Sequence, residues 1–186
     1  MSEDRTFVTG FLAFEGFDIN PSAVLAQRCG RRFELIEVSY SAVDAFVDRL
    51  DLDSFDRWLM LGVAARSSRM RTENFARNVV GGRSDVRGHT PVGEIEPGGP
   101  AQIAGTMWNS SSFSIESRVR RPSDNAGDYL CNYIYYLRLR KIAGTGKAIG
   151  FLHIPPFEQL ELATQVAELR NILAEIEAMR AGASTL

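Results

Sequence analysis

The segment from Ala148 to Ile154, AIGFLHI, constrains the fold more than any other part of the chain. It is almost entirely apolar, ends near a histidine, and is followed directly by two prolines. An apolar run of this length, bounded by a chain breaker, is typical of a strand that is covered on both faces, as strands are in a parallel sheet flanked by helices. The segment from Trp58 to Val63 has the same character. We therefore expect an α/β sheet with helices on both sides.

The other elements follow from apolar periodicity and from helix end signals. Further strands are predicted at 6–9, 33–38 and 113–119, and further helices at 21–30, 41–50 and 157–180. The region 81–109 is rich in glycine and proline and is expected to form a loop-rich rim, with Gly81-Gly82 as a turn. At 186 residues, 45% of them hydrophobic, the chain is long enough for one sizeable core. We predict a single domain over residues 1–186, a three-layer α/β/α sandwich with a mostly parallel, twisted sheet.

Composition excludes several functional classes. The net charge is −2 and there is no long basic run, which argues against nucleic acid as the main partner. No apolar stretch is long enough to span a bilayer, and the start, Met1 to Arg5, lacks the features of a signal peptide. We therefore expect a cytoplasmic, reduced protein with no membrane partner. The basic cluster of Arg118, Arg120 and Arg121 is interpreted as a solvated edge or as a site for a substrate carboxylate.

The two cysteines lie more than a hundred residues apart, a spacing that indicates neither a disulfide framework nor a metal site, and no cofactor is predicted. Cys29, just before Gly30, is expected to pack at a helix end. Cys131 lies in the segment SDNAGDYLCNYIYYLRL, where Asp128 is a suitable N-cap and Cys131 would occupy the third helical position. The first turn of a helix favours a thiolate and offers N–H donors to an oxyanion. A packed, unreactive cysteine is the alternative.

A nucleophilic thiol needs a base, and the chain contains two histidines. His153 ends the apolar strand, and in an α/β sheet the carboxyl ends of the strands form the active crevice. A strand-end histidine with a purely structural role is the alternative. His89 lies in the segment Gly88-His89-Thr90-Pro91 and is expected in a solvated turn.

The chain resembles the pyroglutamyl peptidase I family, the pyrrolidone-carboxylate peptidases, which are cysteine peptidases with a Cys-His-Glu triad. The stretches that carry the resemblance follow one another in the family's order: Thr9-Gly10-Phe11 with Phe14, Gly16 and Asn20-Pro21-Ser22; Glu73 with Ala76, Asn78, Arg83, Gly88 and Pro91-Val92-Gly93; Ala126-Gly127 with Leu130-Cys131-Asn132; and Gly150-Phe151-Leu152-His153-Ile154-Pro155.

The resemblance implies that Cys131 is the nucleophile, His153 the base and Glu73 the group that orients the base. By residue type alone, Glu73 would be interpreted as a surface ion pair with one of the neighbouring arginines, Arg69, Arg71 or Arg77. The activity implied is hydrolysis of the amide bond after an N-terminal pyroglutamyl residue, through a thioester acyl-enzyme.

The substrate-binding residues implied are Phe11 and Phe14, which in the family sandwich the flat ring, together with Val63, Leu130 and Arg83. The phenylalanines have ordinary core packing as their alternative. Arg83 either steers a carboxylate or braces the Glu73 segment.

The chain departs from the family's pattern in the loop Gly62 to Ser67 and in the opening loop. Val63 stands where the family usually has a glutamine that hydrogen-bonds the ring. Leu12, Ala13 and Glu15 replace the family's usual acidic residue, proline and glycine. Loss of a polar partner redirects specificity, because a site built for an amide discriminates through paired polar groups.

Three functions are consistent with these observations: a pyroglutamyl peptidase acting on peptides, a related cysteine hydrolase for another small cyclic amide, and a non-catalytic binding protein on the same scaffold. The family commonly forms oligomers, so a homo-oligomer, a dimer or a tetramer, is also considered. The cluster of Tyr133, Tyr135 and Tyr136 would then be either an interface or part of the core.

Overall fold

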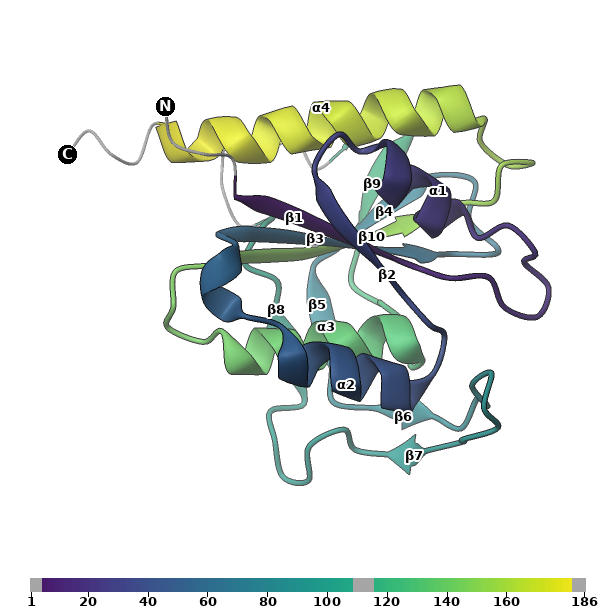
Figure 1. Cartoon of the computed structure of the whole chain (residues 1–186), viewed down its shortest axis with the longest axis vertical. Coiled ribbons are helices and arrows are strands. Elements are labelled where there is room, and N and C mark those ends of the chain that lie inside the picture. The colour runs from purple at the N-terminus through teal and green to yellow at the C-terminus, as the bar shows by residue number, and fades with distance from the viewer. Residues whose placement is uncertain (1–4, 109–115, 182–186) are drawn as a thin grey trace.

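A six-stranded mixed sheet forms the centre of the computed structural model, which describes residues 5–108 and 116–181 (Figure 1). The strand order is β2-β1-β3-β10-β4-β9. The strands β2, β1, β3 and β10 are parallel to one another, β4 is antiparallel to β10, and β9 is parallel to β4. Their bounds are Thr6–Phe11 for β1, Arg32–Ile36 for β2, Arg57–Val63 for β3, Met70–Glu73 for β4, Arg120–Ser123 for β9 and Ala148–Ile154 for β10.

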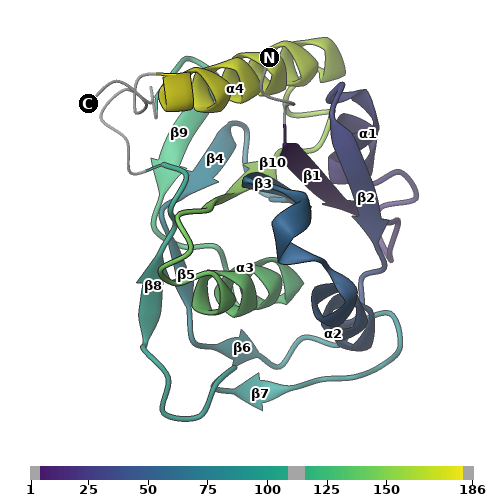
Figure 2. The ribbon, with the colours of Figure 1, turned by 60° about the vertical axis from the view of Figure 1, so that its left-hand side comes forward.

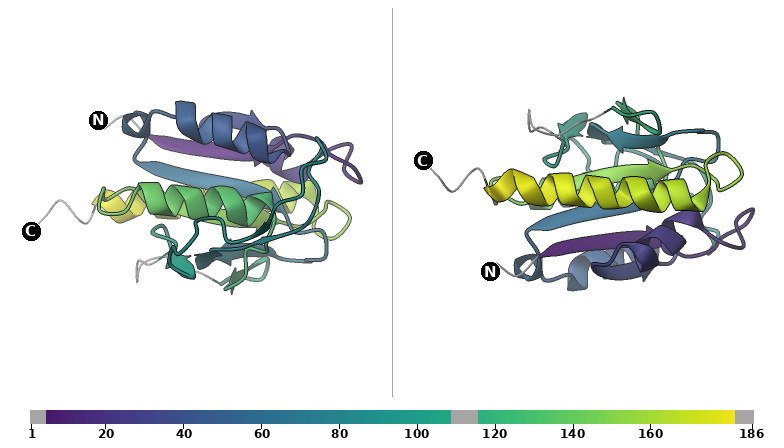
Figure 3. Two further views of the ribbon diagram at one scale, coloured as in Figure 1. Left: turned by 90° about the horizontal axis from the view of Figure 1, so that it is seen from below. Right: turned by 90° about the horizontal axis from the view of Figure 1, so that it is seen from above.

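Helices cover both faces of this sheet, as Figures 2 and 3 show. The helices α1 (Pro21–Arg28) and α4 (Leu162–Ala181) lie on one face, and α2 (Tyr40–Arg49) and α3 (Leu130–Lys141) lie on the other. A short 3-10 helix, η1, spans Leu52–Ser54. The predicted α/β/α sandwich with a mostly parallel sheet is confirmed.

Two small sheets extend the α2/α3 side of the molecule (Figure 2). The strand β5 (Phe75–Arg77) pairs with β8 (Gln102–Ala104), and β6 (Val80–Gly81) pairs with β7 (Val92–Gly93). The strands β7 and β8 lie within 81–109, the region that the sequence predicts to be a loop-rich rim, whereas β5 precedes it. The predicted turn at Gly81-Gly82 is wrong for Gly81, which ends β6, and Gly82 follows at a φ of 76°.

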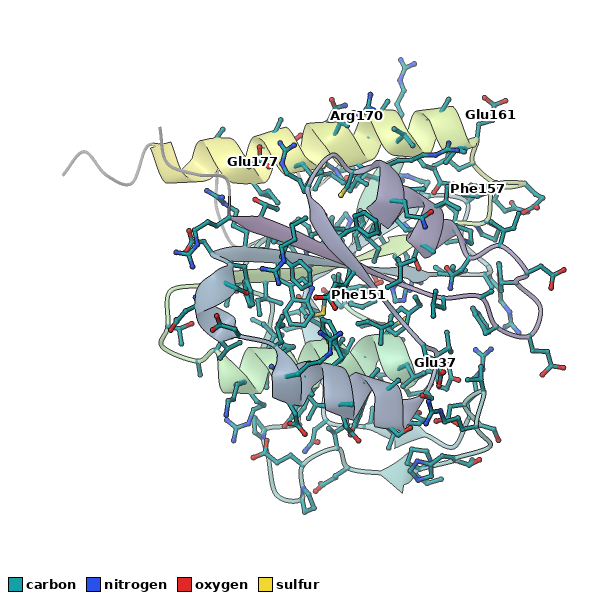
Figure 4. The ribbon with its side chains drawn as sticks, in the orientation of Figure 1. Glu37, Phe151, Phe157, Glu161, Arg170 and Glu177 are labelled. Carbon is teal, nitrogen blue, oxygen red and sulfur yellow. The ribbon has the colours of Figure 1, made fainter. Side chains whose placement is uncertain are left out.

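The central strands have a core on each side because alternate side chains point to opposite faces. In β3, Leu59 and Leu61 pack with α1 and α4, whereas Trp58 and Met60 pack with α2 and α3. In β10, Phe151 belongs to the α2/α3 side, so His153, two residues further on, also projects there. Phe151 lies between the sheet and these two helices (Figure 4). The alternation therefore decides on which face the histidine acts.

The predicted strand at 113–119 is wrong in its described part, and residues 113–115 lie outside the described residues. The hydroxyl of Ser117 accepts hydrogen bonds from the N–H groups of Val119 and Arg120, so the chain turns here and β9 begins only at Arg120. The last helix begins at Leu162 instead of Phe157, because the segment after Pro156 forms a turn whose N–H groups bond to the Pro156 carbonyl.

Arg120 is buried, contrary to the expectation of a solvated basic edge. Its side chain is 2% exposed and lies 3.3 Å from Glu168 and 3.2 Å from Glu175 of α4. Arg118 and Arg121 are exposed as expected. The middle arginine of the cluster therefore fastens the sheet edge to α4.

The tyrosines of α3 belong mainly to the core. Tyr135 and Tyr136 are fully buried, and Tyr133 donates a hydrogen bond from its hydroxyl to Asp44 on α2 at 2.8 Å. Cys29 is the C-cap residue of α1 and is 3% exposed, as the sequence predicts. Within residues 5–108 and 116–181, none of the helices has the length and apolar character that crossing a bilayer requires.

Candidate active site

Cys131 lies in the first turn of α3, one position earlier than predicted. The N-cap is Tyr129, and no side chain of the described residues caps this helix end. Asp128, the predicted N-cap, lies against Gly81 instead, and its carbonyl accepts a hydrogen bond from the Gly81 N–H at 2.8 Å. The first N–H that bonds inside the helix is that of Tyr133, to the Tyr129 carbonyl. The N–H groups before that of Tyr133 make no bond inside the helix, and groups of this kind can bind an oxyanion.

Asn132 anchors this helix end, a role that the sequence analysis did not assign. Its side chain is fully buried and makes hydrogen bonds of 2.8 to 2.9 Å with three backbone groups, the N–H and the carbonyl of Arg77 and the carbonyl of Val79. An asparagine beside a candidate nucleophile in the first helical turn is the signal that could have revealed it. The hydrogen bonds fix the start of α3, which carries Cys131, to the β5 segment and the residues that follow it.

Gly62 gives the thiol room against the sheet. A Cβ atom on Gly62 would lie 2.6 Å from Cys131 Sγ and 2.8 Å from Phe151 Cζ, closer than real Cβ contacts come. Gly62 pairs in register with His153 across β3 and β10. The thiol, the aromatic ring and the histidine strand therefore meet at one point of the α2/α3 face.

Glu73 and His153 form a short hydrogen bond across β4 and β10. His153 Nδ1 lies 2.6 Å from Glu73 Oε1, and both residues are buried, with Glu73 fully so. In the antiparallel register Glu73 lies opposite Phe151 and Arg71 lies opposite His153, so the four side chains share one face of the sheet. Glu73 also forms an ion pair with one of the neighbouring arginines, because Arg71 Nη2 lies 3.0 Å from the same Oε1 atom. The expectation that this pair lies at the surface is wrong, since Glu73 is fully buried.

Burial controls the protonation of the thiol and the imidazole. It raises the pKa of Cys131 to about 12. The negative charge of Glu73 adds to this rise, and the positive charges of Arg83 and Arg71 oppose it. Burial also lowers the pKa of His153, against the hydrogen bond to Glu73. The expected lowering of the Cys131 pKa is therefore wrong, since desolvation outweighs the helix start. At neutral pH the resting pair is a thiol and a neutral imidazole.

The substrate-binding candidates are only partly brought together. Phe14 is half-buried, and the Arg83 guanidinium lies 5.9 Å from the centroid of its ring and 4.7 Å from that of Tyr129, the N-cap of α3. Phe11 and Leu130 are buried in the α2/α3 core. These aromatic and cationic groups border the helix end that carries the thiol.

Val63 is placed differently. It follows Gly62 at the end of β3, so strand alternation directs its side chain to the α1/α4 face, away from Cys131. His89 lies in an exposed loop, as predicted, with its ring 5.7 Å from that of Tyr40. Among the described residues, no group of three or more histidine, cysteine, aspartate or glutamate side chains is arranged to hold a metal ion.

Comparison with known proteins identifies the family of this chain. The family model for pyroglutamyl peptidase matches residues 4–185. The chain belongs to the pyroglutamyl peptidase family. The pyrrolidone-carboxylate peptidase of Bacillus subtilis is 28% identical over an aligned length of 201 residues, and the alignment covers 97% of this chain and 91% of that protein. The pyrrolidone-carboxylate peptidase of Thermococcus onnurineus is 30% identical over 166 residues, covering 81% of this chain and 83% of that protein.

Solved structures of pyroglutamyl peptidases share the fold. A pyrrolidone carboxyl peptidase from Pyrococcus furiosus superposes with a TM-score of 0.80 at 24% identity, covering 94% of this chain and 98% of that chain. The pyroglutamyl peptidase I of Bacillus amyloliquefaciens gives a TM-score of 0.79 at 23% identity, covering 94% and 96%. The α/β/α sandwich is therefore that of the pyroglutamyl peptidases.

Proposed function

We propose that this chain is a cysteine peptidase that hydrolyses the amide bond after an N-terminal pyroglutamyl residue, with Cys131, His153 and Glu73 as its catalytic residues. The observation that carries the proposal is the buried 2.6 Å hydrogen bond between Glu73 and His153, on the sheet face against which Cys131 packs. A nucleophile, a base and a group that orients the base are the components of acyl transfer. The relatives' names supply the substrate class.

The reaction begins from a neutral thiol. As Cys131 Sγ attacks the pyroglutamyl carbonyl, its proton passes to Nε2 of His153, and N–H groups at the start of α3 hold the oxyanion. Glu73 stabilises the imidazolium through Nδ1. The imidazolium then protonates the leaving amine, the C–N bond breaks, and a thioester remains on Cys131. Water attacks the thioester, its proton passing through His153 to the thiol, and pyroglutamate leaves.

The test is release of a fluorogenic amine from its pyroglutamyl conjugate. The wild type should cleave the conjugate and Cys131→Ala should not. Cys29→Ala is the matched control, since it removes the other cysteine, at the far end of α1, and should retain full activity. Cleavage by Cys131→Ala, or no cleavage by the wild type at high enzyme concentration, would exclude the proposed function.

A related cysteine hydrolase acting on another small cyclic amide is the second candidate. The departures in the opening loop favour it, because the family uses that loop to bind the ring. The departure at Val63 does not, since its side chain is directed away from Cys131. The two candidates separate in one assay: a panel of conjugates that differ only in the acyl ring should rank the pyroglutamyl conjugate first under the first proposal and another ring under the second.

We further propose that the enzyme works in a reducing compartment, the cytoplasm. Its mechanism requires a free thiol, and Cys29 and Cys131 are both free. Formation of a disulfide or sulfenic acid at Cys131 would remove the nucleophile, so activity should depend on added reductant after exposure to peroxide.

A further inference from the structure

Arg71 adds a fourth residue, a cation, to the candidate catalytic site. Its Nη2 atom lies 3.0 Å from Glu73 Oε1 and 3.2 Å from His153 Nδ1, and 3.4 Å from the carbonyl of Asn125. The side chain is 24% exposed, whereas Glu73 is fully buried. Glu73 Oε1 thus contacts both Arg71 and His153, whereas Glu73 Oε2 has no hydrogen-bond partner among the described residues.

The three polar atoms admit few arrangements of protons. A guanidinium is always charged and can only donate, so Arg71 cannot accept a proton from the imidazole. If Nδ1 carries the proton, it donates to Glu73 Oε1, and Arg71 donates to the same oxygen. If Nδ1 is bare, it accepts from Arg71, and the 2.6 Å contact with Glu73 then requires a protonated carboxyl group. Only the first arrangement lets Glu73 Oε1 accept from both donors as a carboxylate, in charge-assisted hydrogen bonds of 2.6 and 3.0 Å.

We propose that Arg71 is a positioning residue of the active site: by donating to Glu73 Oε1 beside His153, it holds His153 as the neutral tautomer with its proton on Nδ1. Nε2 is then the free acceptor that takes the proton of Cys131. This inference rests on the proposed function for its catalytic meaning, but the tautomer itself does not depend on the substrate.

The same charge sets the pH range of the site. Glu73 and Arg71 from β4 contact His153. On the other side His153 pairs in register with the uncharged Gly62 of β3, against which Cys131 of α3 packs. Arg83, in the loop after β6, acts on the thiol. Because a cation beside the imidazole disfavours imidazolium and favours thiolate, Arg71 lowers the pKa values of both His153 and Cys131. Removing its charge should therefore raise both.

The experiment compares Arg71→Met, which removes the charge at similar length, with Arg71→Lys, which keeps it. In Arg71→Met both limbs of the kcat/KM profile for the pyroglutamyl conjugate should move to higher pH, by about one unit. Arg71→Lys should restore the wild-type profile. The matched control is Arg121→Met, because Arg121 pairs with Arg71 in register one strand further from His153 and is exposed. Its profile should not move.

A spectroscopic measurement reads the tautomer directly and works on the wild type alone. With nitrogen-15 labelled histidine the chain gives two imidazole spectra, and His89→Gln identifies that of His153. The wild type at neutral pH should show the proton on Nδ1, and Arg71→Met should show a mixture of tautomers or a raised titration midpoint. A proton on Nε2 in the wild type, or a profile and tautomer unchanged in Arg71→Met, would overturn the proposal. Absence of turnover in the wild type would remove the proposed function and leave this measurement intact.

Discussion

Replacement of Gly62 by alanine should disable the site without unfolding the protein. The added methyl group would start 2.6 Å from Cys131 Sγ and 2.8 Å from Phe151 Cζ. Optimal heavy-atom contacts are at about 3.5–4.0 Å, so one of these neighbours must move by about 1 Å. Phe151 is fully buried and has no room to move, whereas the Cys131 side chain is partly exposed and can rotate. The sulfur is therefore the atom that is expected to give way.

The effect of Gly62→Ala on stability and its effect on catalysis can be measured separately. Overpacking of a core typically costs about 1–3 kcal/mol of unfolding free energy. A displacement of about 1 Å of a reacting atom costs about 100-fold in rate, which corresponds to about 2.7 kcal/mol of transition-state stabilisation. The measurements are kcat/KM on the pyroglutamyl conjugate and the midpoint of thermal unfolding.

Gly150→Ala is the matched control for this experiment. Gly150 lies in the neighbouring strand β10 on the opposite face, where a Cβ atom would lie 2.6 Å from Trp108 and 2.8 Å from Met107. It should lose similar stability while kcat/KM stays within about twofold of the wild type. If Gly62→Ala also kept kcat/KM within that range, tight packing around the thiol would not be what positions it.

Three further results are expected. Asn132→Ala removes three hydrogen bonds and leaves backbone groups unpaired. Urea unfolding should show that the free energy of unfolding falls by about 1–3 kcal/mol, and kcat/KM should fall in parallel. An unchanged stability would contradict the anchoring role. Arg120→Met removes the cation that two carboxylates of α4 pair with, so the free energy of unfolding should fall by about 3–5 kcal/mol. The value of kcat/KM at low temperature should not change. The pKa of Cys131 is raised from 9.0 to about 12 in the folded state, so between these pH values the folded state keeps the thiol proton and the unfolded state loses it. The free energy of unfolding should therefore fall as pH rises from 9 towards 12. Thermal unfolding of Cys131→Ala should show a smaller loss of stability over that range.

The sheet and the helices were predictable because each rests on a local pattern. The apolar runs of β3 and β10, and the Asn20, Pro21 and Gly30 signals of α1, specify their elements within a few residues. The prediction of a strand at 113–119 failed in the described part of that segment, because the turn made by Ser117 depends on hydrogen bonds from two backbone N–H groups to its hydroxyl. Alternating residues predict a strand equally well whether or not such a turn forms.

For the candidate site, residue types could be predicted but not the contacts between them. A strand-end histidine and a cysteine at a helix start indicate chemistry by position alone. The role of Arg71 depends on the antiparallel direction of β4, which places it opposite His153 and puts Glu73 two residues away on the same face. Had β4 been parallel, the register would have been different, and no pattern in the sequence specifies that direction.

The protonation of Cys131 shows most clearly where position and environment conflict. A helix start stabilises an exposed anion by about 0.3–1 kcal/mol, whereas burial of an unpaired charge costs several kilocalories per mole. Cys131 is only partly exposed, and packing against Gly62 and Phe151 removes part of the water around the sulfur, so desolvation is the larger effect. The thiol then stays protonated until a carbonyl is present to accept the sulfur electrons, and the proton moves to His153 as the S–C bond forms. Reactivity is thereby tied to substrate binding: alkylation of Cys131 by a small reagent at neutral pH should be slow relative to acylation by a bound substrate.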